Sequence, residues 1–156
     1  MAIQGKPNAF PHTETDFSTV VWTAFGVRLL RDAGYGTIAN EFNGRWRQLD
    51  NNAAGHNVLV VRQAIAPDAD PPENASQFDY EEGTVESFNT SVGPGIVADG
   101  SAVYGSTQPA GTGWLANLRR YTVPFGHHMV MVDTFTVADG RPPLDVDSFF
   151  HSSPPP

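Results

Sequence analysis

Two adjacent histidines, His127 and His128, are the side chains of this 156-residue chain best suited to bind a metal or move a proton. A third, His12, stands near the N-terminus, with Glu14 and Asp16 at the next alternate positions. Such a nitrogen and oxygen set suits zinc or non-haem iron, although His127 and His128 would share one ion only in a loop, because neighbours on a strand face opposite ways. One hypothesis is therefore a small metal-dependent enzyme or ligand-binding domain that uses His12, His127 and His128. In the competing interpretation, Glu14 and Asp16 cap a helix and the paired histidines lie at the end of a strand.

The other motifs that could carry chemistry are weaker. Two Asp-x-Asp triplets, at 68–70 and 145–147, resemble carboxylates that hold Mg²⁺ or Ca²⁺, but they fit solvated loop acids better because no phosphate-binding loop accompanies them. The glycines of 93–95 and 111–113 lack the spacing of a nucleotide-binding loop. The chain has no cysteine and no Gly-x-Ser-x-Gly motif. We therefore expect that it is not an enzyme, and the sequence names no cofactor.

A pair of arginines, Arg119 and Arg120, stands directly before Tyr121. An arginine beside an aromatic ring can stack on a ligand or pair with an acidic partner. The simpler expectation is that one of the two arginines is solvated and the other pairs with a nearby carboxylate.

Charge limits the classes of partner. The net charge is −8, and residues 63–100 contain eight acidic residues and no lysine or arginine. With nine Lys and Arg in all, the chain is a poor candidate for nucleic-acid binding, which needs clustered cations. No apolar stretch approaches the roughly 20 residues of a membrane-spanning helix, and no secretory pattern opens the sequence, so we expect synthesis in a cytoplasm. Charged residues make up 17% of the chain, below the usual ~25%, which favours a protein that assembles with others.

The longest proline-free block, residues 12–66, carries the helical patterning. An i, i+3, i+4, i+7 apolar series runs through residues 17–27, and Trp22 and Phe25 form a second apolar stripe beside it. This pattern predicts a helix buried on more than one side, with Gly26 in its middle. A turn around Gly34 and a second amphipathic pattern over 37–50 complete a predicted helical hairpin.

The rest of the chain favours β-structure. Strands are predicted within 57–65, 77–92 and 127–137, with a hairpin at Asp99-Gly100 and a short helix or strand over 114–123. The expected fold class is α+β: an N-terminal helical hairpin packed on a mostly antiparallel, loop-rich β-sheet. Residues 1–12 are expected to form an extended arm, 13–140 a single domain, and 141–156 a Pro-rich tail.

These features favour a structural or adaptor subunit of a larger assembly, such as a virion or phage-particle component. Its partners would be other protein subunits in a homo- or hetero-oligomer, contacted through the terminal arms. The expected contact residues are the tail pair Phe149 and Phe150, with Trp22 and Phe25 of the apolar helix. Removal of 141–156 should then weaken assembly without unfolding the domain. A third class is a binding module whose Gly-rich 93–113 loops grip a glycan or peptide, with Tyr104 and Trp114 as aromatic contacts.

Overall fold

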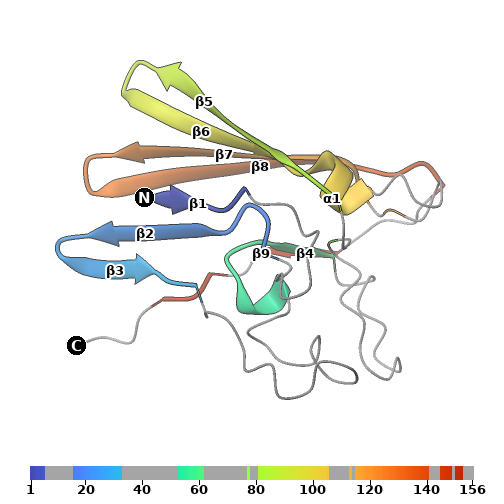
Figure 1. The fold of residues 1–156 in the computed structure, drawn as a ribbon, viewed down its shortest axis with the longest axis horizontal. Helices are drawn as coiled ribbons and strands as arrows, with labels where there is room; N and C mark the ends of the chain where they lie inside the picture. The colour runs from blue at the N-terminus through green and yellow to red at the C-terminus, as the bar shows by residue number, and fades with distance from the viewer. Residues whose placement is uncertain are drawn as a thin grey trace.

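The computed structural model of the chain describes residues 1–5, 16–32, 53–61, 77, 81–105, 113, 115–140, 145–148 and 150–152. Over these residues the fold is mostly antiparallel β-structure, arranged in sheets of four, three and two strands (Figure 1). The described helical elements are the five-residue α1 (Ser101–Gly105) and the 3₁₀ turn η3 (Ala53–Gly55). The prediction of an α+β fold built on a helical hairpin is therefore wrong.

The predicted first helix is a β-hairpin. Strand β2 (Val20–Ala24) pairs with β3 (Val27–Leu30), and the two turn residues, Phe25 and Gly26, have φ values of 55° and 74°. Positive φ at both central residues is the requirement of the tight turn that matches strand twist, so Gly26 closes a hairpin instead of interrupting a helix. The run from Thr19 to Thr23 is β-branched or aromatic throughout, and this propensity prevails over the helical spacing. The second predicted helix, over 37–50, lies outside the described residues.

The four-stranded sheet contains the long hairpins. Its strand order follows the chain, and two-residue turns at 91–92 and 126–127 join the pairs. The predictions of strands within 77–92 and 127–137 are confirmed, and the described residues of the 114–123 segment, 115–123, lie in a strand. The predicted Asp99-Gly100 hairpin is wrong, because the Asp99 carboxylate accepts the Ser101 N–H at 3.0 Å and starts α1 there. The strands are β5 (Thr84–Thr90), β6 (Gly93–Asp99), β7 (Leu115–Phe125) and β8 (His128–Val137).

The described parts of both predicted arms belong to sheets. Strand β1 (Ala2–Ile3) pairs with β2, and β9 (Val146–Ser148) pairs with the buried strand β4 (Leu59–Val61). Beyond β9, Ser152 forms a β-bridge with Leu30. For these described residues, each end of the chain supplies a strand to the fold.

One apolar cluster lies where α1 and β4 meet the four-stranded sheet. The Phe17 ring packs so closely on Gly83 that a Cβ there would lie 2.1 Å from it. Beside it, the Gln77 side chain donates to the Tyr104 hydroxyl at 2.9 Å, and that hydroxyl donates to the Leu59 carbonyl at 2.8 Å. Burial accordingly raises the pKa of the Tyr104 phenol above its ordinary value. The cluster comprises Phe17, Leu59, Val61, Ala98, Val103, Tyr104, Leu115 and Leu118.

A second, polar centre, formed by the hydrogen bonds of Asn57, connects the sheets. The buried Asn57 side chain donates from Nδ2 to the Val20 and Arg31 carbonyls, both at 2.9 Å, and its Oδ1 accepts the His151 N–H at 2.6 Å. Its backbone carbonyl accepts a hydrogen bond from the buried Arg120 guanidinium. Asn57 thereby joins β2, the end of β3, the C-terminal segment and β7 at one point.

Candidate interaction face

The strand alternation of the four-stranded sheet separates a buried face from an outer one. Ala98, Arg120 and Asp133 are register partners across β6, β7 and β8, and Ala98 and Arg120 are both 1% exposed. Paired residues point to the same face, so their chain neighbours point to the other. The outer face comprises Thr84, Glu86 and Phe88 of β5, Val97 and Asp99 of β6, Arg119, Tyr121, Val123 and Phe125 of β7, and His128, Val130, Val132, Thr134 and Thr136 of β8.

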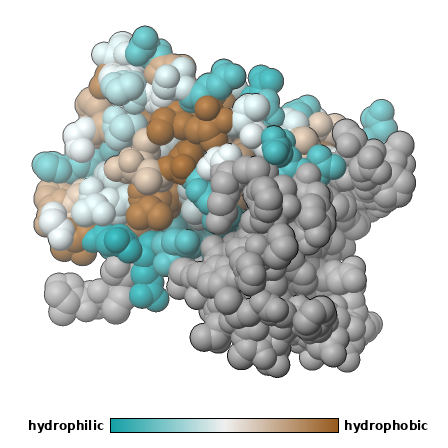
Figure 2. Space-filling view, viewed as in Figure 1, coloured by the Kyte–Doolittle hydropathy of each residue, from teal (hydrophilic) through white to brown (hydrophobic). Residues whose placement is uncertain are grey.

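The outer face carries exposed apolar side chains toward β8. Val130 is 54% exposed, Val132 is 49% exposed and Phe125, beside the β7–β8 turn, is 54% exposed. Figure 2 shows apolar residues on the surface at the upper left, where Figure 1 draws the strands of this sheet. Large contiguous apolar patches are uncommon on monomeric soluble proteins and mark sites of interaction. The outer face is therefore the candidate functional surface.

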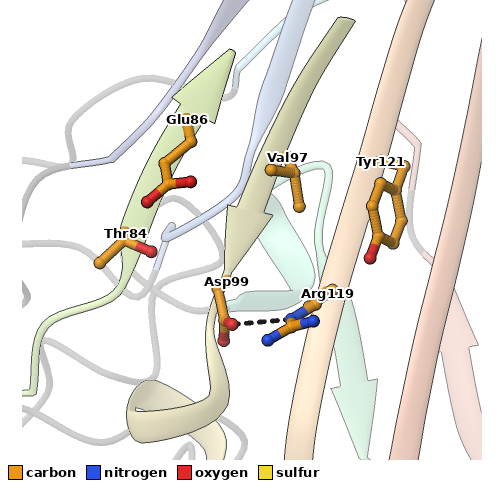
Figure 3. A pocket seen from close by; sticks show the side chains of 6 residues that line it. All are labelled: Thr84, Glu86, Val97, Asp99, Arg119 and Tyr121. Atoms are coloured by element: carbon orange, nitrogen blue, oxygen red, sulfur yellow. Dashed lines mark hydrogen bonds and ion pairs between the residues drawn. The ribbon is translucent and has the colours of Figure 1, made fainter. Parts of the chain in front are cut away.

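A hollow of about 240 Å³ lies on the outer face toward β5 (Figure 3). On its floor the Arg119 Nε donates to the Asp99 carboxylate at 2.8 Å, and Tyr121 stands next along β7. Phe88 meets the Tyr121 ring edge-on with centroids 6.0 Å apart, in space that the absent side chain of Gly95 leaves free. The residues lining the hollow are Thr84, Glu86, Val97, Asp99, Arg119 and Tyr121.

Both arginines of the Arg119-Arg120 pair thus bind aspartates, on opposite faces. Arg119 pairs with Asp99 on the outer face, and Arg120 pairs with Asp133 on the inner face at 2.7 Å. The expectation that one of them is solvated holds in part, since the Arg119 side chain is 56% exposed whereas that of Arg120 is 1% exposed. The hydrogen bond that Arg119 donates to the Asp99 carboxylate, and a second that it makes with the Tyr121 side chain, raise the pKa of Arg119.

The Asp99 carboxylate is expected to contribute stability that acid removes. Burial raises its pKa, but the hydrogen bonds from Ser101 and Arg119 outweigh that effect, and the pKa lies below the ordinary 3.8. A carboxyl with a lowered folded pKa stabilises the fold above about pH 4, and this stability is lost as pH falls through the lower folded value. Asp99→Asn, which keeps the cap at α1, should cost about 1 kcal/mol at pH 7 and almost nothing near pH 2. Urea unfolding of both proteins at the two pH values measures this, and an equal difference at both would contradict it.

No protein-family model, curated protein or solved structure matches this chain, so the sequence and the geometry alone bear on its function.

The histidines predicted as metal ligands take separate places. The His127 ring stacks on Phe25, with centroids 4.1 Å apart, so the tips of the β2–β3 and β7–β8 hairpins touch. His128 begins β8 on the outer face, opposite Phe125, and His12 lies outside the described residues. Within the described part of the chain, no three metal-ligating side chains come together.

The predicted contact residues are also spread over the fold. Phe25 is 71% exposed at its hairpin turn, and Trp22 is half-buried in β2. Phe150 is exposed near the C-terminus, whereas Phe149 and Trp114 lie outside the described residues. Tyr104 is fully buried and has no surface to offer a glycan or peptide. Sequence reasoning missed Val130 and Val132, although apolar residues at successive positions 129–132 signal a strand that is apolar on both faces.

A buried histidine and a half-buried aspartate form the one pairing among the described residues that resembles part of a catalytic triad. His56 Nδ1 lies 2.5 Å from the Asp32 carboxylate, as in a histidine oriented for base catalysis. The His56 side chain is 0% exposed, and its Nε2, the atom that would meet a substrate, is buried as well. This geometry suits a structural pair.

Among the described residues, no helix has the length and apolar character needed to cross a membrane.

Proposed function

We propose that this chain is a structural subunit of a protein assembly and that it contacts neighbouring subunits through its outer face. The observation that carries the proposal is the exposed apolar surface of β7 and β8, centred on Val130 and Val132. Exposure of such side chains is unfavourable by roughly 25 cal/mol per Å² of apolar area, and a protein neighbour that covers them removes that cost.

The composition of the outer face supports a protein partner. Its apolar side adjoins the hollow that holds Arg119 and Tyr121 beside Phe88. Arginine and the aromatic residues are the types enriched in protein–protein interfaces, and they supply most of the binding energy there. The low charge of the chain as a whole, 17% of residues, points the same way.

This proposal moves the contact surface away from the chain ends. The C-terminal segment already pairs with β4 and with Leu30 of its own chain. A sheet face, unlike a free arm, gives a rigid contact that needs little ordering on association. Particles of repeated subunits, of which a virion is one example, are built from such contacts.

A charge placed in the exposed apolar part of the outer face, on β8, tests the proposal. In Val132→Lys, an ammonium group replaces a side chain that is 49% exposed and would be buried by a neighbour. We expect the self-association measured by light scattering to weaken at least about tenfold. Val92→Lys is the matched control, because Val92 is 51% exposed but lies in the β5–β6 turn, and it should associate like the wild type.

The two variants also show how the proposal would fail. Equal association of Val132→Lys, Val92→Lys and wild type would exclude the outer face as the contact. Circular dichroism of each variant tests whether the fold is kept. We expect that it is, because both substituted positions are exposed.

A further inference from the structure

We infer that the neighbour of this face is a second copy of the same chain, and that two copies join by antiparallel pairing of their β8 strands. The two four-stranded sheets then form one continuous sheet about a two-fold axis, with their outer faces side by side. The inference rests on the proposed function and names its partner.

The first observation is that one edge of β8 has no partner strand among the residues that the structure describes. This strand is the last in the order β5-β6-β7-β8 and pairs with β7 along its length, from His128 opposite Phe125 to Val137 opposite Leu115. On its other edge, no strand pairing or backbone hydrogen bond connects β8 to any other segment that the structure describes. Alternate N–H and C=O groups of its ten residues point to that edge, and another strand is the partner that satisfies such a row.

The second observation is the residue content of this edge. Between His128 and Val137 there is no lysine, arginine, proline or glycine, the types with which monomeric proteins protect an open strand. Its single acid, Asp133, points to the inner face and is neutralised by Arg120. Val130, Val132 and Thr134 stand exposed on the outer face beside it. A long, apolar and uncharged edge is suited to pairing.

Charge indicates that the pairing is between two β8 strands. The opposite edge of the sheet is β5, with Glu86 on it and Glu81 and Glu82 just before it. In a chain of net charge −8, two β5 edges would bring these carboxylates together, whereas two β8 edges leave them at the far ends of the joined sheet.

The mixed arrangement does not give a two-fold dimer. A β8 edge paired with the β5 edge of the next copy is a heterologous contact, which leads to a ring or to an open filament. Pairing of β8 with β8 uses the same surface on both chains and closes after two copies. It also makes the apolar sides of the two outer faces, each with Val130 and Val132, continuous across the axis.

Single cysteines locate the junction, because the natural chain has none. The outer-face positions of β8 are tested one at a time as Val130→Cys, Val132→Cys, Thr134→Cys and Thr136→Cys. Thr84→Cys and Glu86→Cys place the same group on the outer face of β5 as controls. Each protein is oxidised mildly at a concentration where light scattering shows association, and the covalent dimer is measured on a non-reducing gel.

The expected result is a covalent dimer from one β8 position or from two neighbouring ones. A residue opposite its own copy lies about 4.5–5.5 Å away between Cα atoms, inside the range that a disulfide spans. Moving the cysteine two residues along the strand separates the pair by four residues, about 13–14 Å, so the yield should fall sharply on either side. The β5 controls should give little dimer.

Two outcomes overturn the inference, and they differ in what they leave standing. An associated protein that cross-links from β5, or from no β8 position, excludes the β8 junction but not the proposed assembly. A protein of monomeric mass at every concentration excludes the second copy and leaves only a different chain as the neighbour proposed above.

Discussion

Replacing Arg120 with methionine is expected to lower the free energy of unfolding by about 3–5 kcal/mol, a large part of the roughly 5–15 kcal/mol that stabilises a typical domain. The Arg120 side chain is 1% exposed, and its Nε and Nη2 donate to both oxygens of Asp133, at 2.7 and 2.8 Å. Its Nη1 donates to the carbonyls of Ser18 and Asn57. Methionine fills much of the same space but leaves a largely buried carboxylate and two buried carbonyls without these donors, and such groups are costly.

The neighbouring arginine is the matched control. Arg119→Met also removes an ion pair from β7, but the Arg119 side chain is 56% exposed, and exposed pairs contribute about 0–1 kcal/mol. Urea unfolding at one fixed protein concentration compares the two, because association also adds to apparent stability. Equal losses for Arg119→Met and Arg120→Met would contradict the structural role of the buried pair.

Removal of residues 141–156 is expected to abolish cooperative folding. The cut deletes β9, which pairs with all three residues of β4 and packs Val146 against the apolar cluster. It also deletes the bridge from Ser152 to Leu30 and the His151 N–H that binds Asn57. These losses expose the edge of a buried strand and break the polar centre, so the sum should approach the total stability of about 5–15 kcal/mol.

A shorter cut is the control for this truncation. Removal of 153–156 retains every contact named above, and the protein should keep a sharp thermal transition close to that of the wild type. Circular dichroism and calorimetry distinguish the two truncations. A sharp, unshifted transition after removal of 141–156 would show that this segment is the dispensable arm that the proline content suggests.

The β-strands of the C-terminal half could be predicted because their signal is local. The 127–137 segment alternates β-branched and other residues and is followed by a turn at Gly140, and its residues 128–137 form β8 as expected. The first helix could not be rejected in this way. Its apolar residues are so closely spaced that they fit the helical period and the strand period equally well. The turn also places Phe25, a bulky residue, at a φ of 55°, and no sequence rule anticipates this.

The candidate site depends on information that is not local. Whether Val130 and Val132 are exposed is decided by the position of β8 at the end of its sheet, and strand order leaves no mark in the sequence. The same holds for Arg119 and Arg120, since their identical side chains acquire different roles only when β7 has one covered face and one open one. The polar centre at Asn57 connects residues 20, 31, 120 and 151, and only the folded chain brings them together.

The mass of the wild-type protein in solution tests the central claim most directly. Light scattering after size exclusion, over a wide range of loading concentrations, should give a mass that rises from near 16.9 kDa toward twice that value. A mass of 16.9 kDa at every concentration would contradict the claim that another copy contacts this chain at the β8 side of its outer face.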